Sequence, residues 1–224
     1  MIRRRLGRNG PEVSAIGLGC MSFAGFYGAT DREESFRCLD AARDLGIDFL
    51  DTAELYGMGL SEEVIGAYMA DRKATFQIAT KGGIIPKPTR HFNNSPSYFR
   101  DALEKSLKRL GVERIALYYA HRHDAEVPVE EVAGTLSRFV EEGKIDGIGF
   151  SEIAPATLRR AHAAHPVTAI QNEYSLWTRQ PELGMLQATE ELGVAFVAFS
   201  PLGRGIFAET PPDPTHLSLI HISE

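Results

Sequence analysis

The sequence has few cysteines, no excess of basic charge and no long apolar run. Its 224 residues include only Cys20 and Cys38, too few for a disulfide framework or a cysteine-based zinc site. The 30 acidic residues outnumber the 24 basic ones, so a net charge of −6 offers nucleic acid no overall basic field. No apolar run approaches the ~20 residues that span a bilayer, and no apolar segment of a secretory signal follows the basic N-terminus. These absences favour a cytoplasmic protein without nucleic-acid or membrane partners, and they leave its oligomeric state open.

The chain instead alternates short apolar runs with longer helical patterns. Seven runs have the length of buried parallel strands: 15–20, 47–51, 76–81, 115–120, 145–150, 167–171 and 194–200. Such a β(αβ) repeat predicts a parallel sheet with helices outside it. No Gly-x-Gly-x-x-Gly turn follows the first run, which favours a (β/α)8 TIM barrel over an open dinucleotide-binding sheet. Before the first run, the turn residues Asn9-Gly10 predict an N-terminal β-hairpin.

Polar residues stand where six of the expected strands end: Asp51, Lys81, His121, Ser151, Gln171 and Ser200. In a barrel of this class, that rim is where active sites are built. Tyr56 follows Asp51 in the same rim loop, and a lysine nearby favours the phenolate and lowers the tyrosine pKa. We expect Tyr56 to act as a general acid and His121 to hydrogen-bond a substrate oxygen, an arrangement suited to carbonyl–alcohol interconversion.

The sequence also contains candidates for two binding sites of other kinds. His121-x-His123-Asp124 resembles a metal-ligand cluster, but Arg122 would repel a cation, so we expect no metal. The stretch 200–205 follows the seventh strand and contains small residues and Arg204, which predicts an anion site of the kind that binds phosphate.

The same residues resemble the aldo-keto reductase superfamily, especially its pyridoxal-reductase-like and perakine-reductase-like branch. The matching stretches are 51–57, 79–83, 118–124, 149–152, 171–176 and 199–205. The resemblance implies an NADP-dependent oxidoreductase that reduces an aldehyde or ketone to an alcohol. Tyr56 would be the general acid, Asp51 and Lys81 would tune it, and His121 would orient the carbonyl. A cofactor-binding regulatory subunit with little turnover, or an inactive fragment, is the alternative.

The resemblance also implies a set of cofactor-binding residues. The carboxamide of NADPH would be held by Ser151, Glu152 and Gln171, and Phe199 would stack on the nicotinamide. Glu152 stands where many relatives have asparagine, and an ionised carboxylate cannot donate a hydrogen bond. The pyrophosphate would bind at Ser200, Pro201, Leu202, Gly203 and Arg204. Rim aromatics predict either an apolar substrate pocket or loop packing: Phe23, Phe26, Tyr27 and Trp177.

The resemblance ends near residue 208. Compared with a complete relative, the expected single barrel domain (1–208) lacks helix 7, strand 8, helix 8 and the loop that grips the 2′-phosphate. We therefore expect an incomplete barrel with two unpaired edges that folds poorly and binds NADPH weakly. Residues 209–224 are expected to be a non-native or disordered tail, because 217–224 match a translated sequencing adapter residue for residue.

Overall fold

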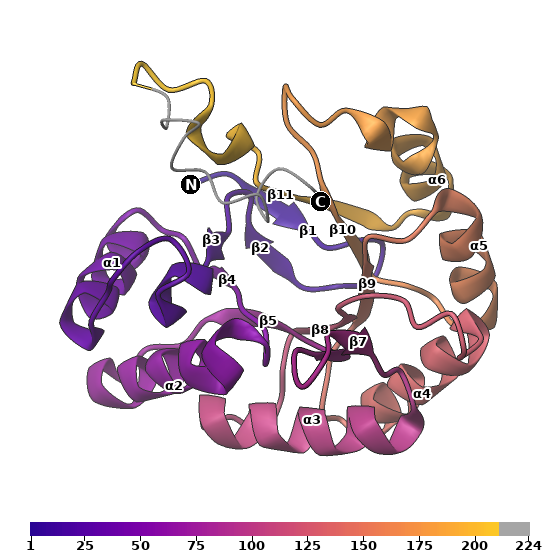
Figure 1. Cartoon of the computed structure of the whole chain (residues 1–224), viewed down its shortest axis with the longest axis horizontal. Coiled ribbons are helices and arrows are strands. Elements are labelled where there is room, and N and C mark those ends of the chain that lie inside the picture. Colours follow the sequence, from indigo (N-terminus) through magenta and orange to yellow (C-terminus); the bar gives the residue numbers. More distant parts are fainter. Residues whose placement is uncertain (211–224) are drawn as a thin grey trace.

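Seven parallel strands form the main sheet of the computed structural model, which describes residues 1–210 (Figure 1). In their order across the sheet they are β11 (Ala195–Phe199), β10 (Ala169–Glu173), β9 (Ile148–Ser151), β8 (Leu117–Ala120), β5 (Gln77–Gly82), β4 (Phe49–Asp51) and β3 (Leu18–Gly19). The sheet curves into a nearly closed barrel with helices on its outer face, which confirms the expected α/β TIM-barrel-like fold.

Each crossover between neighbouring strands passes through a helix on the outside of the sheet. The α-helices of the described part are α1 (Arg32–Asp44), α2 (Leu60–Arg72), α3 (Pro96–Leu110), α4 (Val129–Glu141), α5 (Pro155–Ala164) and α6 (Met185–Leu192). Their starts follow local chemistry: at α3, Ser95 accepts a hydrogen bond from the Tyr98 backbone N–H and Pro96 takes the first helical position. None of the helices within residues 1–210 combines the length and apolar composition that crossing a membrane requires.

Two antiparallel hairpins are added to the barrel. The first, β1 (Arg3–Arg5) with β2 (Glu12–Ser14), confirms the predicted N-terminal hairpin. Its Leu6 and Val13 are buried with barrel-interior residues such as Phe49 and Tyr119, so it covers one end of the barrel core. The second, β6 (Ile84–Ile85) with β7 (His91–Phe92), follows β5 at the opposite rim and was not predicted.

The edges of the main sheet are β3 and β11. Within residues 1–210, no hydrogen-bonded ladder joins them, so the barrel wall has a seam there. The expected first strand over 15–20 is shortened to Leu18–Gly19, and just before it the Ser14 hydroxyl donates a hydrogen bond to the Ile16 carbonyl. Of the expected tail, Glu209 and Thr210 are exposed, and 211–224 lie outside the described residues.

Candidate active site

The carboxyl ends of the strands bring the expected residues to one rim, around a cavity of about 550 Å³. This cavity, which Asp51, Tyr56 and His121 line, is called the inner cavity. The cavity is lined by side chains from five of the seven strand ends and from the loops beyond them. Among the predicted residues, its walls include Asp51, Tyr56, His121, Ser151, Gln171, Phe199, Ser200 and Arg204. The rim position inferred from the sequence therefore corresponds to a real concavity.

Lys81 lies under this cavity with its side chain 1% exposed. Its Nζ donates hydrogen bonds to Asp51 Oδ1 (2.5 Å) and to the Thr52 carbonyl (2.8 Å). The other oxygen of Asp51 accepts a hydrogen bond from Gln171 Nε2 at 2.7 Å. Burial acts to lower the pKa of Lys81, but the Asp51 carboxylate and the neighbouring Tyr56 oxygen outweigh it and raise the pKa, so the ammonium stays protonated.

Tyr56 begins a short 3₁₀ turn, η2 (Tyr56–Gly59), just past β4. The Lys81 ammonium lies 5.2 Å from the centroid of its ring. Burial raises the pKa of Tyr56, and although the charge of Lys81 acts to lower it, the net direction is upward. The lowered pKa expected from the sequence is therefore wrong in net direction, because burial is the larger effect. A tyrosine with a raised pKa keeps its proton at neutral pH, which suits an acid.

A buried ion pair supports the turn that carries Tyr56. Glu62, fully buried in the first turn of α2, accepts hydrogen bonds from Arg109 Nε (2.7 Å) and Thr80 Oγ1 (2.5 Å). Gly59 has a φ of +99°, and a Cβ there would lie 2.6 Å from Arg109 Cδ. Glycine is thus required for the guanidinium to pass beneath the turn. No local sequence pattern predicts this pair, because its members lie 47 positions apart.

Glu54 gives this loop a second support, which the sequence did not predict either. Its Oε1 accepts hydrogen bonds from the Gly83 backbone N–H (3.1 Å) and from the Tyr98 hydroxyl (2.5 Å). The loop after β4 is thereby tied to the end of β5 and to α3. Burial raises the pKa of Glu54, and burial together with the neighbouring carboxylate raises that of Tyr98.

His121 packs edge-on against Tyr56, with ring centroids 6.0 Å apart and an interplanar angle of 81°. Burial, and then the charges of Lys81, Arg122 and Arg90, hold the pKa of His121 well below its usual value. The imidazole is therefore neutral at pH 7, with one N–H to donate and one nitrogen to accept. Its Nδ1 is buried and has no hydrogen-bond partner within residues 1–210.

The histidine pair considered as a metal site lacks a third ligand in the described part of the chain. No group of three or more histidine, cysteine, aspartate or glutamate side chains in residues 1–210 is placed to hold a metal ion. Asp124 instead bonds the Asn94 backbone N–H at 3.3 Å.

The expected carboxamide-binding residues lie together at the ends of β9 and β10, already engaged with the protein. Ser151 Oγ accepts a hydrogen bond from Arg122 Nη1 at 3.2 Å, and Gln171 donates to the aspartate described above. Glu152 Oε1 accepts from the Glu173 backbone N–H at 2.7 Å. The arrangement brings the three predicted residues side by side and gives each a protein partner.

The loop after β11 contains the expected pyrophosphate residues. Phe199 lines the inner cavity, as do Ser200 and Arg204, whereas Pro201 and Leu202 are exposed. Arg204 donates from both terminal nitrogens to the carboxylate of Glu173, at 3.0 and 3.2 Å. The sequence did not predict this pairing between the end of β10 and the loop after β11.

The structure places the rim aromatics in three different surroundings. Phe26 and Tyr27 line the inner cavity, Phe23 is buried in the main core, and Trp177 is exposed. Phe23 has the packing role, whereas a substrate contact for Phe26 and Tyr27 stays a prediction; Trp177 has neither position.

A family model described as "Aldo/keto reductase family" matches residues 15–217. The chain belongs to the aldo/keto reductase family. A curated relative, "Probable aldo-keto reductase 1" of Glycine max, is 45% identical over 207 residues, which are 91% of this chain and 60% of the relative. This aldo/keto reductase chain therefore spans about 60% of the length of that relative.

Solved structures of family members have the same architecture. Aldo-keto reductase AKR11C1 from Bacillus halodurans, in its holo form, superposes with a TM-score of 0.86 at 31% identity, over 96% of this chain and 71% of that one. Glycerol dehydrogenase AKR11B4 from Gluconobacter oxydans gives a TM-score of 0.86 at 29% identity, over 96% and 69% of the two chains. The branch within the aldo/keto reductases stays a prediction.

Proposed function

We propose that this chain is an NADPH-dependent reductase that converts an aldehyde or ketone to an alcohol, with Tyr56 as the general acid. The observation that supports this best is the buried Lys81–Asp51 pair (2.5 Å) beneath a tyrosine and a neutral histidine that share one cavity wall. Family membership supplies the reaction class. Of the four side chains, the tyrosine supplies the proton, the Lys81–Asp51 pair supplies the charge beside it, and the histidine is a second hydrogen-bond donor.

The proton movement follows from the charges of the site. Tyr56 gives its hydroxyl proton to the substrate oxygen, and the nearby Lys81 ammonium stabilises the phenolate left behind. Asp51 keeps that ammonium charged and in place. Neutral His121 donates an N–H to the same substrate oxygen, so two donors meet the negative charge that develops there. When bound, NADPH supplies the hydride that the carbonyl carbon accepts.

The residues at the ends of β9, β10 and β11 fit a nicotinamide cofactor. Gln171 and Ser151 are register partners in neighbouring strands, so their side chains project from the same face and offer an amide both donors and acceptors. The aromatic face of Phe199 borders the same cavity. We propose that Ser151, Glu152, Gln171 and Phe199 hold the nicotinamide end and that the loop 200–204 holds the phosphates. Binding there requires Arg204 to exchange its contact with Glu173 for a phosphate.

A direct assay tests this function. The incomplete barrel is expected to fold poorly, so the assay is applied to preparations that melt cooperatively and bind NADPH. We expect these to oxidise NADPH in the presence of an aromatic aldehyde and to form one equivalent of the alcohol, measured by nicotinamide absorbance and by chromatography. Omission of the aldehyde is the control. A chain that binds NADPH tightly but forms no alcohol from a panel of aldehydes and ketones would instead have the regulatory role.

The directions of the two pKa shifts predict the pH dependence. Tyr56 must be protonated to act, and its pKa is raised above 10.0, so the acid form persists throughout the neutral and mildly alkaline range. His121 is already neutral because its pKa is held well below 6.5. We expect the single-turnover rate of reduction to be flat from about pH 7 to about pH 9 and to fall only at higher pH. A midpoint near pH 6.5, or a loss of rate beginning near neutrality, would contradict the assignment.

A further inference from the structure

Glu54 connects two elements of the active site without lining the inner cavity itself. It lies two positions before Tyr56 in the loop after β4, and the described residues that line the inner cavity include Leu55 and Tyr56 but not Glu54. Its backbone N–H donates a hydrogen bond to the Lys81 carbonyl at 3.1 Å. Glu54 therefore joins the loop that carries Tyr56 to the strand that carries Lys81.

The side chain of Glu54 takes the place of the next bond in the β4–β5 ladder. In a regular parallel ladder, the residue that donates to Lys81 would accept, through its own carbonyl, from the N–H of Gly83. The Gly83 N–H donates instead to Glu54 Oε1, at 3.1 Å. A side-chain oxygen thus ends the ladder, and the backbone can leave the sheet and enter η2, where Tyr56 lies.

The same end of β5 also holds the backbone of the catalytic histidine. The His121 N–H donates to the Gly82 carbonyl at 2.8 Å. Gly82 stands between Lys81 and Gly83, the two residues that Glu54 bonds. Three consecutive residues of β5 therefore fix the relative places of the lysine, the histidine and the tyrosine loop, and Glu54 closes this connection on the side of the loop.

The connection depends on an acceptor oxygen rather than on a charge. Oε1 of Glu54 accepts from both the Gly83 N–H (3.1 Å) and the Tyr98 hydroxyl (2.5 Å), which uses the two lone pairs of one oxygen. Burial is the largest effect on the pKa of Glu54 and raises it, so the folded chain disfavours the charged form. Glutamine offers an equivalent oxygen and no charge, and it can make the same two bonds.

We propose that Glu54 is a positioning residue of the active site, which holds Lys81 and the Tyr56 loop at the separation that proton transfer requires. The inference rests on the reductase function proposed above and adds a residue that lies outside the catalytic group and the cofactor site. Without the side-chain oxygen, the Gly83 N–H loses its acceptor and the loop loses one of its bonds to β5. A displacement of about 1 Å at a reacting group can cost about 10²-fold in rate.

A comparison of Glu54→Ala with Glu54→Gln tests the positioning role by kinetics. We expect Glu54→Ala to lower the single-turnover rate of carbonyl reduction by about 10- to 100-fold. KM for NADPH should stay at the parent value, because the lost bond is remote from the ends of β9, β10 and β11. Glu54→Gln should keep the parent rate. Equal losses in the two variants would assign the effect to the carboxylate charge and overturn the proposal.

Amide hydrogen exchange, followed by NMR on preparations that melt cooperatively, measures the connection without turnover. In Glu54→Ala, exchange at the Gly83 and His121 amides should become about 5-fold faster or more, the size expected for one lost hydrogen bond. Glu54→Gln should leave both amides at the parent rate, and the amides of α5 should not change in either variant. Faster exchange throughout the chain would show a general loss of stability and overturn the positioning role.

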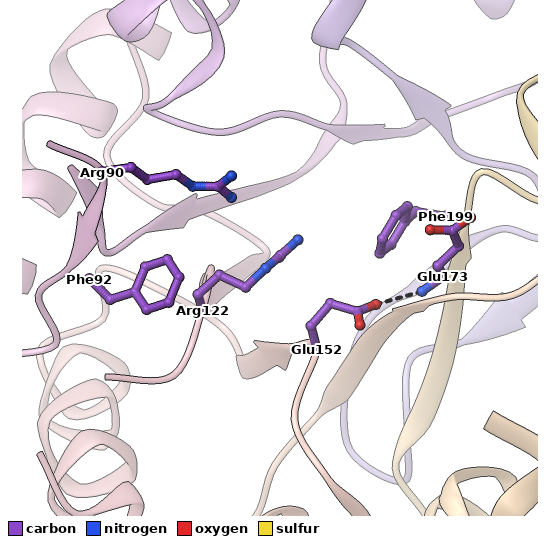
Figure 2. A pocket seen from close by; sticks show the side chains of 6 residues that line it. All are labelled: Arg90, Phe92, Arg122, Glu152, Glu173 and Phe199. Carbon is purple, nitrogen blue, oxygen red and sulfur yellow. Dashed lines mark hydrogen bonds between the residues drawn. The ribbon is translucent and has the colours of Figure 1, made fainter. Parts of the chain in front are cut away.

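Glu152→Ala is the matched control for the exchange experiment. Figure 2 shows the bond that it removes, in which Glu152 Oε1 accepts from the Glu173 backbone N–H at 2.7 Å. This is the same kind of bond, from a carboxylate to a backbone N–H, but it joins the ends of β9 and β10. Exchange at Gly83 and His121 should therefore not change in this variant, and an increase as large as that of Glu54→Ala would overturn the assignment to Glu54.

The two experiments separate this inference from the proposed reaction. If no carbonyl compound is reduced but the exchange results are as expected, the reductase function fails and the connection through Glu54 stands. If the parent chain reduces carbonyl compounds and Glu54→Ala reduces them equally fast, the positioning role is overturned and the reductase function stands.

Discussion

Replacement of Tyr56 by phenylalanine is expected to lower the rate of carbonyl reduction by about 10²- to 10⁴-fold, the range typical for loss of a general acid. The ring that packs against His121 remains, so the cavity keeps its shape and only the proton donor is lost. NADPH binding should change little, because the hydroxyl is not among the residues proposed to hold the cofactor. Single-turnover kinetics and a separate measurement of NADPH affinity distinguish the two effects.

Tyr174→Phe is the matched control for this variant. It removes the same atom from a tyrosine whose hydroxyl bonds Glu182 at 2.8 Å, away from the inner cavity. We expect its turnover to equal that of the parent chain. If Tyr56→Phe also kept the parent rate, another residue would have to donate the proton, and the role of Tyr56 would be rejected.

Replacement of Glu62 by alanine is expected to lower the free energy of unfolding by about 3 kcal/mol or more, the cost of leaving one partner of a buried ion pair alone. The side chain of Arg109 is only 18% exposed and would lose the carboxylate that pairs with it. The Thr80 hydroxyl would lose its hydrogen-bond acceptor. Denaturant unfolding followed by circular dichroism measures the change, provided that the transition is cooperative.

An exposed ion pair gives the comparison for Glu62. Glu191 pairs with Arg159 between α6 and α5, and both side chains are nearly half exposed. Glu191→Ala should therefore change the unfolding free energy by less than about 1 kcal/mol. Replacing both Glu62 and Arg109 by apolar residues should restore part of the lost stability. Equal effects of Glu62→Ala and Glu191→Ala would show that the buried network does not stabilise the fold.

The residues at the rim of the barrel could be predicted from the sequence, because the patterns that mark a strand end are local. An apolar run that ends in Asp51, Lys81 or His121 places that residue at a strand end, and parallel strands bring such ends to one side. The β6–β7 hairpin was missed because two-residue strands are too short to show a period. That hairpin places Arg90 at the cavity, so this lining residue was missed with it.

Other features of the site depend on packing between distant segments. The direction of the Tyr56 pKa shift is set by burial, which no neighbouring residue in the sequence reveals. Arg204 meets Glu173 only because β10 and β11 are adjacent in the sheet. The pairing of Glu62 with Arg109 likewise requires α2 and α3 to pack side by side. Residue type and spacing predict which strand end carries a charge, but the partner of that charge follows from the fold.

One carboxylate oxygen of Asp51 accepts a hydrogen bond from Lys81 of β5, and the other accepts one from Gln171 of β10. A single side chain therefore links two strands that are not neighbours in the sheet. Substitutions at these three positions are consequently not independent events. Removing the amide of Gln171 leaves one oxygen of Asp51 without this hydrogen bond. The change also alters how Asp51 binds Lys81, although Gln171 and Lys81 lie on different strands. A double-mutant cycle on the free energy of unfolding, with substitutions at positions 171 and 81, should therefore show a coupling energy of about 0.5–3 kcal/mol. The same cycle in a chain with Asp51 replaced by alanine should show no coupling.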